Sequence, residues 1–135
     1  MSKYQELNKM LIADMPIPYW EDEQQFLAQD LVQTFGDADW VELSEDWRGK
    51  SPSWQQRLCQ TLSEAVSSDI PVGIVIELTA DESYDVSLAA VDALRTMDVS
   101  NLKGNSELID RVSELSKGGK IAQAVCNDLL KKLNR

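Results

Sequence analysis

Apolar residues recur along this chain at intervals of three and four positions, the spacing that places side chains on one side of an α-helix. Helix start signals accompany these stripes: Ser2 with Gln5 matches a capping box, and Ser51 with Pro52 combines an N-cap with a proline in the first turn. Helices are therefore predicted near residues 2–12, 22–35, 39–47, 52–66, 72–79, 85–97, 106–116 and 119–134. The predicted fold class is all-α.

The segment from Val72 to Thr79 can be interpreted in two ways. It is short and β-branched, which is typical of a buried strand. No second strand-like run is present to pair with it, and a strand alone would leave its backbone groups without hydrogen bonds in the core. A short buried helix is therefore favoured, and a strand remains the alternative.

The predicted helices repeat at a nearly fixed step. A central apolar residue of each longer helix recurs at Leu31, Leu62, Leu94 and Val125, and a second set recurs at Leu27, Leu58, Ala90 and Ile121. A constant step of this length is typical of stacked helical hairpins. The sequence thus predicts a short right-handed stack of antiparallel helical hairpins, forming a single domain over residues 1–135. An irregular helical bundle with loops of similar length is the alternative.

The region from Ile74 to Met97 resembles the join between two HEAT-type helices. In such repeats a short helix ending in leucine is followed by an acidic turn, then Asp-Val and an alanine-rich helix, which corresponds here to Asp85-Val86 and Ala89–Leu94. Gly73 departs from the pattern. The resemblance implies a HEAT-like α-solenoid, and small acidic HEAT-like proteins of this length resemble the immunity proteins encoded beside bacterial toxins.

Charge is unevenly distributed along the chain, whose formal net charge is −10. Residues 1–50 hold eleven acids against four bases (−7), residues 51–100 hold eight against two (−6), and residues 101–135 hold four against seven (+3). Such a body repels nucleic acid and anionic membrane surfaces and attracts cationic proteins. A role in solubility alone is the alternative.

The sequence offers little equipment for catalysis. It contains no histidine, which removes the commonest general base and metal ligand. Gly49-Lys50-Ser51 and Asp37-Ala-Asp39 begin like phosphate and calcium loops, but the other positions of both motifs are missing. We therefore predict a non-enzymatic protein with no cofactor and no metal site.

The two cysteines and the four tryptophans are assigned by their surroundings. Cys59 and Cys126 lie far apart within helical stripes and are predicted to be buried thiols. Trp40 and Trp54 are predicted core residues. Trp47 lies among acids, so we predict an exposed aromatic anchor there, with the charges steering a partner and the ring supplying burial.

The favoured function is an immunity-type inhibitor that neutralises a cognate cationic toxin domain, with a nuclease as the first candidate. The alternative is a helical-repeat adaptor or scaffold subunit of a cytosolic protein complex. The chain has neither a long apolar run nor a signal-peptide core, so a cytoplasmic protein without membrane contact is expected. The predicted partner-binding residues are Asp37, Asp39, Glu42, Glu45, Asp46 and Trp47, together with Glu77, Asp81, Glu82, Tyr84 and Asp85.

Overall fold

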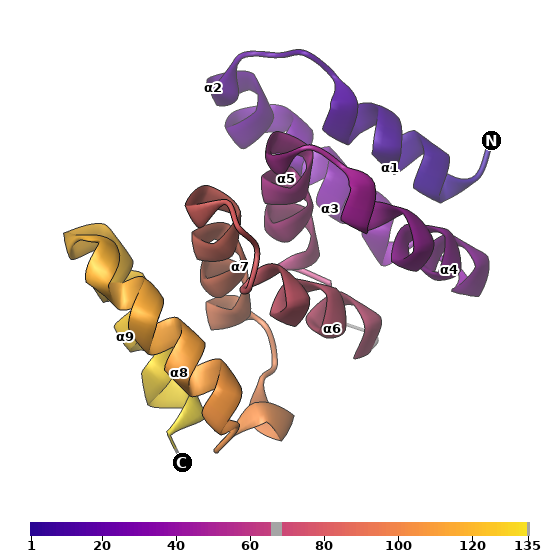
Figure 1. Ribbon diagram of the computed structural model, residues 1–135. Coiled ribbons are helices and arrows are strands. Elements are labelled where there is room, and N and C mark those ends of the chain that lie inside the picture. The colour runs from indigo at the N-terminus through magenta and orange to yellow at the C-terminus, as the bar shows by residue number, and fades with distance from the viewer. Residues whose placement is uncertain (66–68, 135) are drawn as a thin grey trace.

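The computed structural model describes residues 1–65 and 69–134, and over these ranges it consists of helices and loops without a strand (Figure 1). The α-helices are α1 (Lys3–Ile12), α2 (Ile17–Tyr19), α3 (Gln25–Gln33), α4 (Asp37–Asp46), α5 (Pro52–Leu62), α6 (Asp69–Leu78), α7 (Tyr84–Thr96), α8 (Ser106–Leu115) and α9 (Lys120–Leu133). A π-helix, η1 (Trp20–Gln24), joins α2 to α3, and the 3₁₀ turns are η2 (Trp47–Gly49), η3 (Ser100–Leu102) and η4 (Ser116–Gly118). The predicted all-α class is confirmed.

Helix starts follow the capping signals in the sequence. The Ser2 hydroxyl accepts from Gln5 N at 3.1 Å while the Gln5 side chain accepts from Ser2 N, so the predicted capping box is present. Ser51 caps α5 in the same way, with Pro52 in its first turn. These contacts satisfy backbone N–H groups that have no partner inside the helix.

Three boundaries differ from the sequence prediction. The ambiguous segment is helical, as favoured, but α6 begins at Asp69, three residues before the predicted start, and runs to Leu78. The helix expected from residue 22 is preceded by α2 and η1, since Pro16 and Pro18 begin a helical turn as well as following α1. The helix expected to reach residue 66 ends earlier, because α5 stops at Leu62, and residue 66 itself lies outside the described residues.

The longer helices pack in sequence order: α3 contacts α5, α5 contacts α7, and α7 contacts α9 (Figure 1). Hydrogen bonds join neighbours about one repeat step apart. Gln29 Nε2 donates to the Gln60 carbonyl at 3.0 Å, and Arg95 Nη1 contacts Asp128 Oδ2 at 2.8 Å. The shorter helices flank this row, with α1 against α3, α4 and α5, α6 against α5 and α7, and α8 against α9.

Burial follows position within the row. Leu58, Leu62, Ala90 and Leu94, on α5 and α7, are fully buried. The equivalent positions on the outer helices differ: Leu27 on α3 is 55% exposed and Ile121 on α9 is 78% exposed, while Leu31 and Val125 are half-buried. The predicted second apolar set is thus buried only in the two middle helices, because these have neighbours on both sides.

The remaining core assignments are confirmed. Trp40 and Trp54 are buried, and Trp54 Nε1 donates to Asn8 Oδ1 at 3.0 Å. Cys59 and Cys126 are buried free thiols. Burial raises the pKa of the Cys59 thiol to about 12, with a smaller contribution from Asp81, so the thiol stays protonated and unreactive at neutral pH.

Candidate functional site

The predicted surface begins on α4, whose acids serve different purposes. Asp37 and Glu45 are exposed and Glu42 is half-buried. None of these three carboxylates forms an ion pair within the part of the chain that the structure describes. They are therefore available to a cationic partner.

Asp39, by contrast, is a structural residue with 9% of its surface exposed. Its Oδ2 accepts from Gly36 N at 3.0 Å and its Oδ1 accepts from Tyr4 N at 3.2 Å, which ties the start of α4 to α1. Gly36, rather than Asp39, is the N-cap residue of α4. The helix predicted from residue 39 therefore begins two residues earlier, at Asp37.

Asp46 is also occupied by contacts within the protein. It accepts from the Tyr4 hydroxyl at 2.5 Å and pairs with Lys50 at 3.1 Å. The Tyr4 hydrogen bond, followed by the effect of Lys50, lowers the pKa of the Asp46 carboxyl. Burial and then the Asp46 contact raise the pKa of Tyr4, so its hydroxyl remains a donor.

Trp47 is not an exposed anchor, and that prediction is wrong. Its ring is 5% exposed, and the guanidinium of Arg48 lies 4.6 Å from the ring centroid. The Trp47 carbonyl accepts from Gln55 Nε2 at 3.1 Å, which fixes η2 against α5. A large aromatic ring next to core helices gains more from burial than from exposure.

The second predicted group adjoins the first through one ion pair. Glu77, at the end of α6, accepts both hydrogen bonds from Arg48 Nη2 at 2.9 Å, and α4 packs against α6. Asp81 accepts from Ser83 N at 2.9 Å and shapes the turn before α7. Glu82 and Asp85 are exposed beyond this turn. The free carboxylates of this group are therefore those of the turn and the start of α7.

Tyr84 lies against a different neighbour. Its ring and hydroxyl touch the space above Gly118 in η4, so that a Cβ at position 118 would collide with them. The side chain is 42% exposed. Tyr84 thus joins α7 to the segment before α9 and remains partly accessible.

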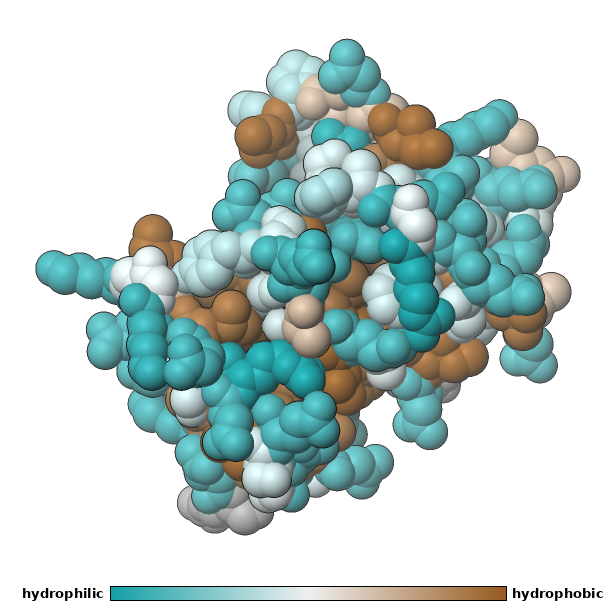
Figure 2. Space-filling model, in the orientation of Figure 1, coloured by the Kyte–Doolittle hydropathy of each residue, from teal (hydrophilic) through white to brown (hydrophobic). Residues whose placement is uncertain are grey.

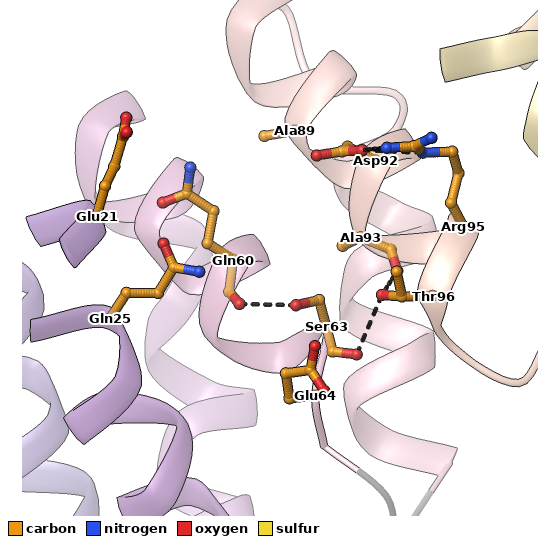
Figure 3. A pocket seen from close by; sticks show the side chains of 10 residues that line it. All are labelled: Glu21, Gln25, Gln60, Ser63, Glu64, Ala89, Asp92, Ala93, Arg95 and Thr96. Carbon is orange, nitrogen blue, oxygen red and sulfur yellow. Dashed lines mark hydrogen bonds and ion pairs between the residues drawn. The ribbon is translucent and has the colours of Figure 1, made fainter. Parts of the chain in front are cut away.

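A hollow of about 310 Å³ lies between η1, α3, α5 and α7, and sequence reasoning did not find it (Figure 3). Its walls are built by Glu21, Gln25, Gln60, Ser63, Glu64, Ala89, Asp92, Ala93, Arg95 and Thr96. Gln60 on α5 and Glu64, two residues after its end, each precede a residue of α7 by the same interval, Asp92 and Thr96 respectively. The same spacing in the sequence that predicted the buried apolar positions therefore also relates these polar residues. That spacing was the signal in the sequence that could have identified the hollow.

Charges within this hollow are only partly balanced. Arg95 pairs with Asp92 and with Asp128, and the Asp92 hydrogen bond is the largest cause of the raised pKa of Arg95. Glu21 and Glu64 are exposed, without an ion pair among the described residues. The hollow is suited to cationic or amide groups.

The described residues also show whether the chain has metal-binding groups or helices that could cross a membrane. No group of three or more histidine, cysteine or acidic residues is arranged to hold a metal ion within residues 1–65 and 69–134. The same residues contain no helix with both the length and the apolar character needed to cross a bilayer. Figure 2 shows a face that is mostly hydrophilic, with hydrophobic residues in separate patches.

Comparison of the chain with protein-family models, with curated proteins and with solved structures gives no match, so its function has to be inferred from its own residues.

Proposed function

We propose that this protein is an immunity-type inhibitor that binds and neutralises a cognate cationic toxin domain in the cytoplasm, with a nuclease as the first candidate toxin. The observation that carries the proposal is a set of exposed carboxylates that form no ion pair among the described residues, on a body of net charge −10. These include Glu45 on α4, Glu82 in the turn before α7 and Asp85 in the first turn of α7. A nuclease domain holds phosphates with a basic surface, and such carboxylates can occupy it in their place.

The proposed scaffold is a HEAT-like α-solenoid. The order of contacts from α3 through α5 and α7 to α9 supports it, as does the near-constant step between hydrogen-bonded residues of neighbouring helices. In stacked repeats each unit contacts mainly its neighbours, and equivalent positions line up into one extended surface. Acidic residues at equivalent positions of neighbouring units would then contribute to one negative electrostatic potential.

The test first establishes whether a toxin-domain gene adjoins the gene for this chain, and then mixes its product with the chain. We expect the chain to abolish its activity at equimolar concentration and to associate faster at low than at high salt, since exposed charges act over about a Debye length of ~10 Å at 0.1 M ionic strength. Full toxin activity in the presence of excess chain would contradict the proposal.

A charge-reversal series measures how much the carboxylates contribute. Changing Glu45, Glu82 and Asp85 to lysine should slow association at low salt by roughly tenfold or more, within the range that electrostatic steering supplies. Asp46 is left unchanged because it holds Tyr4. A matched control reverses Asp14, Glu64 and Asp110, which are exposed, lie outside the predicted surface and form no ion pair among the described residues, with the same change in net charge. Equal slowing in both variants would assign the effect to net charge alone.

The second candidate function is an adaptor that joins two components of a cytosolic complex. The opposite charges of its parts favour it, since residues 1–50 total −7 and residues 101–135 total +3. An adaptor would bind the neighbouring gene product and leave its activity intact. The activity assay therefore separates the two functions.

A further inference from the structure

The outer side of α3 carries an apolar pair between two carboxylates. Phe26 and Leu27 are each 55% exposed, and the exposed acids Glu23 and Asp30 lie within one helical turn on either side of them. Neither acid forms an ion pair with another described residue. We refer to Glu23, Phe26, Leu27 and Asp30 as the α3 outer face.

A hollow of about 460 Å³ adjoins this face, between α1 and α3. Met10, Leu27 and Leu31 give it apolar walls, and the polar residues Glu6, Lys9 and Gln24 also line it. Gln24 Nε2 donates to the exposed Tyr19 hydroxyl at 3.1 Å, so a second aromatic residue lies close to the hollow. The hollow is large enough for an apolar side chain from another molecule.

The π-helix η1, which precedes α3, is fixed to the core by the contacts of Trp20. Trp20, in the π-helix η1, is 3% exposed, and its Nε1 donates to Gln60 Oε1 at 2.5 Å. The guanidinium of Arg57 lies 5.4 Å from the Trp20 ring centroid and donates to the carbonyls of Leu11 and Ala13. π-Helical turns are often found at functional sites. A fixed surface loses little entropy on binding, which favours association.

We propose that the α3 outer face is the docking surface for a basic protein partner that inserts an apolar side chain into the hollow between α1 and α3. The inference rests on the proposed function for the charge of the partner and adds a different surface to it. Exposed aromatic and aliphatic residues beside a pocket act as anchors, while surrounding charges raise the association rate. The face replaces Trp47 as the aromatic part of the interface.

Charge decides between two occupants of this face. A second copy of the chain would bring another net charge of −10, and the resulting repulsion opposes close approach. A basic partner gains from Glu23 and Asp30 and also from Glu21 and Asp22 on η1, which are exposed and without an ion pair among the described residues. The face therefore fits a cationic partner.

The first experiment probes the purified protein by heteronuclear NMR with synthetic peptides. The probe is an amphipathic peptide of lysine and leucine, compared with a lysine–serine peptide of equal charge and a glutamate–leucine peptide of opposite charge. We expect the lysine–leucine peptide to shift the amide signals of residues 17–31, less strongly at high salt, and the other two to shift them weakly. The absence of such shifts, or equal shifts with lysine–serine, would overturn the proposal.

Two variants locate the contact. Phe26→Ser should weaken binding of the lysine–leucine peptide roughly fivefold or more, as expected for an anchor residue. Glu23→Gln with Asp30→Asn should reduce the salt dependence of binding, while Glu21 and Asp22 maintain the remainder. Val41→Ser is the matched control, because Val41 is also 55% exposed but lies on α4. Unchanged binding by Phe26→Ser, or an equal loss with Val41→Ser, would contradict the assignment.

Two further measurements keep this inference separate from the proposed function. Light scattering of the protein alone should give a monomer, and a dimer that Phe26→Ser dissociates would identify a second copy as the occupant and overturn the proposal. With the cognate toxin domain, inhibition that survives Phe26→Ser and the acid-neutralising pair at full affinity would refute the docking surface and leave the inhibitor function intact. Peptide binding without any toxin inhibition would support the docking surface and refute the inhibitor function.

Discussion

Equivalent apolar positions are buried in the middle of the helix row and exposed at its N-terminal edge. Leu58 and Ala90, on α5 and α7, are completely buried, whereas the equivalent Leu27 on α3 is more than half exposed. Trp47, surrounded by acids in the sequence, packs into the core beside α5, and Phe26, also near acids, lies in solvent. A helix with neighbours on both sides buries its apolar positions, while a helix at the edge leaves part of its surface for another molecule.

The largest effect should come from removing the aromatic ring that is buried. Trp47→Ala should lower the free energy of unfolding by about 3–5 kcal/mol, because it leaves a cavity where an indole ring was packed. Phe26→Ala should change it by no more than about 0.5 kcal/mol, as is typical of surface positions. Urea unfolding followed by circular dichroism measures both. Similar losses in the two variants would remove the distinction between core and edge.

The aliphatic positions give the same comparison at a slightly smaller scale. Leu62→Ala and Leu94→Ala should each cost about 2–5 kcal/mol, because both side chains are fully buried in the middle helices. Leu27→Ala should cost about 0.5 kcal/mol. Thermal unfolding of the three variants would show whether the edge contributes to stability. A loss at Leu27 as large as that at Leu94 would mean that α3 is covered in solution.

Two glycines compare a crowded position in η4 with an open position in α6. Gly118→Ala should destabilise by about 1 kcal/mol, near the lower end for an overpacked site, since Tyr84 is partly exposed and its ring can move aside. Gly73→Ala should stabilise by up to about 1 kcal/mol, because Gly73 lies within α6 and a Cβ there meets nothing within 4 Å. Changes of the same sign in both variants would contradict this difference.

A further prediction concerns the contact between α1 and α4. Tyr4→Phe keeps the buried ring but removes the hydrogen bond to Asp46, and it should cost about 1 kcal/mol at neutral pH. The folded state lowers the pKa of Asp46, so this carboxylate stabilises the fold above its ordinary pKa of 3.8, and the stabilisation is lost as the pH falls through the lowered value. The two proteins should therefore converge in stability at low pH.

NMR titration provides the control for this last prediction. In Tyr4→Phe the pKa of the Asp46 carboxyl should rise toward 3.8, although the contact to Lys50 still holds it somewhat lower. An unchanged titration of Asp46 would show that Lys50, and not Tyr4, sets its pKa.

Much of the local structure could be predicted from the sequence. The capping residues Ser2 and Ser51 start helices where expected, and the apolar stripes centred on Leu62 and Leu94 are buried. Residues 72–79 could be assigned to a helix only because no partner strand was found elsewhere in the chain. Such features depend on residues a few positions apart, or on the whole composition, and both can be read directly from the sequence.

The candidate site was predicted less well, for a physical reason. Acidic residues look alike in the sequence, yet they have different contacts in the fold. Asp39 accepts from Gly36 N and Tyr4 N, and Asp46 receives a hydrogen bond from the Tyr4 hydroxyl. Glu82 is exposed and forms no ion pair with the residues that the structure describes. The distant partner of both aspartates is Tyr4, which lies 35 residues from Asp39 and 42 residues from Asp46 in the sequence. Only the packing of α1 on α4 brings these residues into contact. The hollow between α3, α5 and α7 depends on that packing in the same way.

By itself the sequence determined the helices, the step between them, the absence of histidine and the strongly negative charge, because each follows from residue identity and local spacing. Only the tertiary structure decided which members of each class are buried. The packing of η2 on α5 covers Trp47, whereas Phe26 lies exposed on α3, and that difference depends on how the helices pack. Burial depends on the surroundings of a residue in the fold, so one of two aromatic residues in similar acidic segments can be buried and the other exposed.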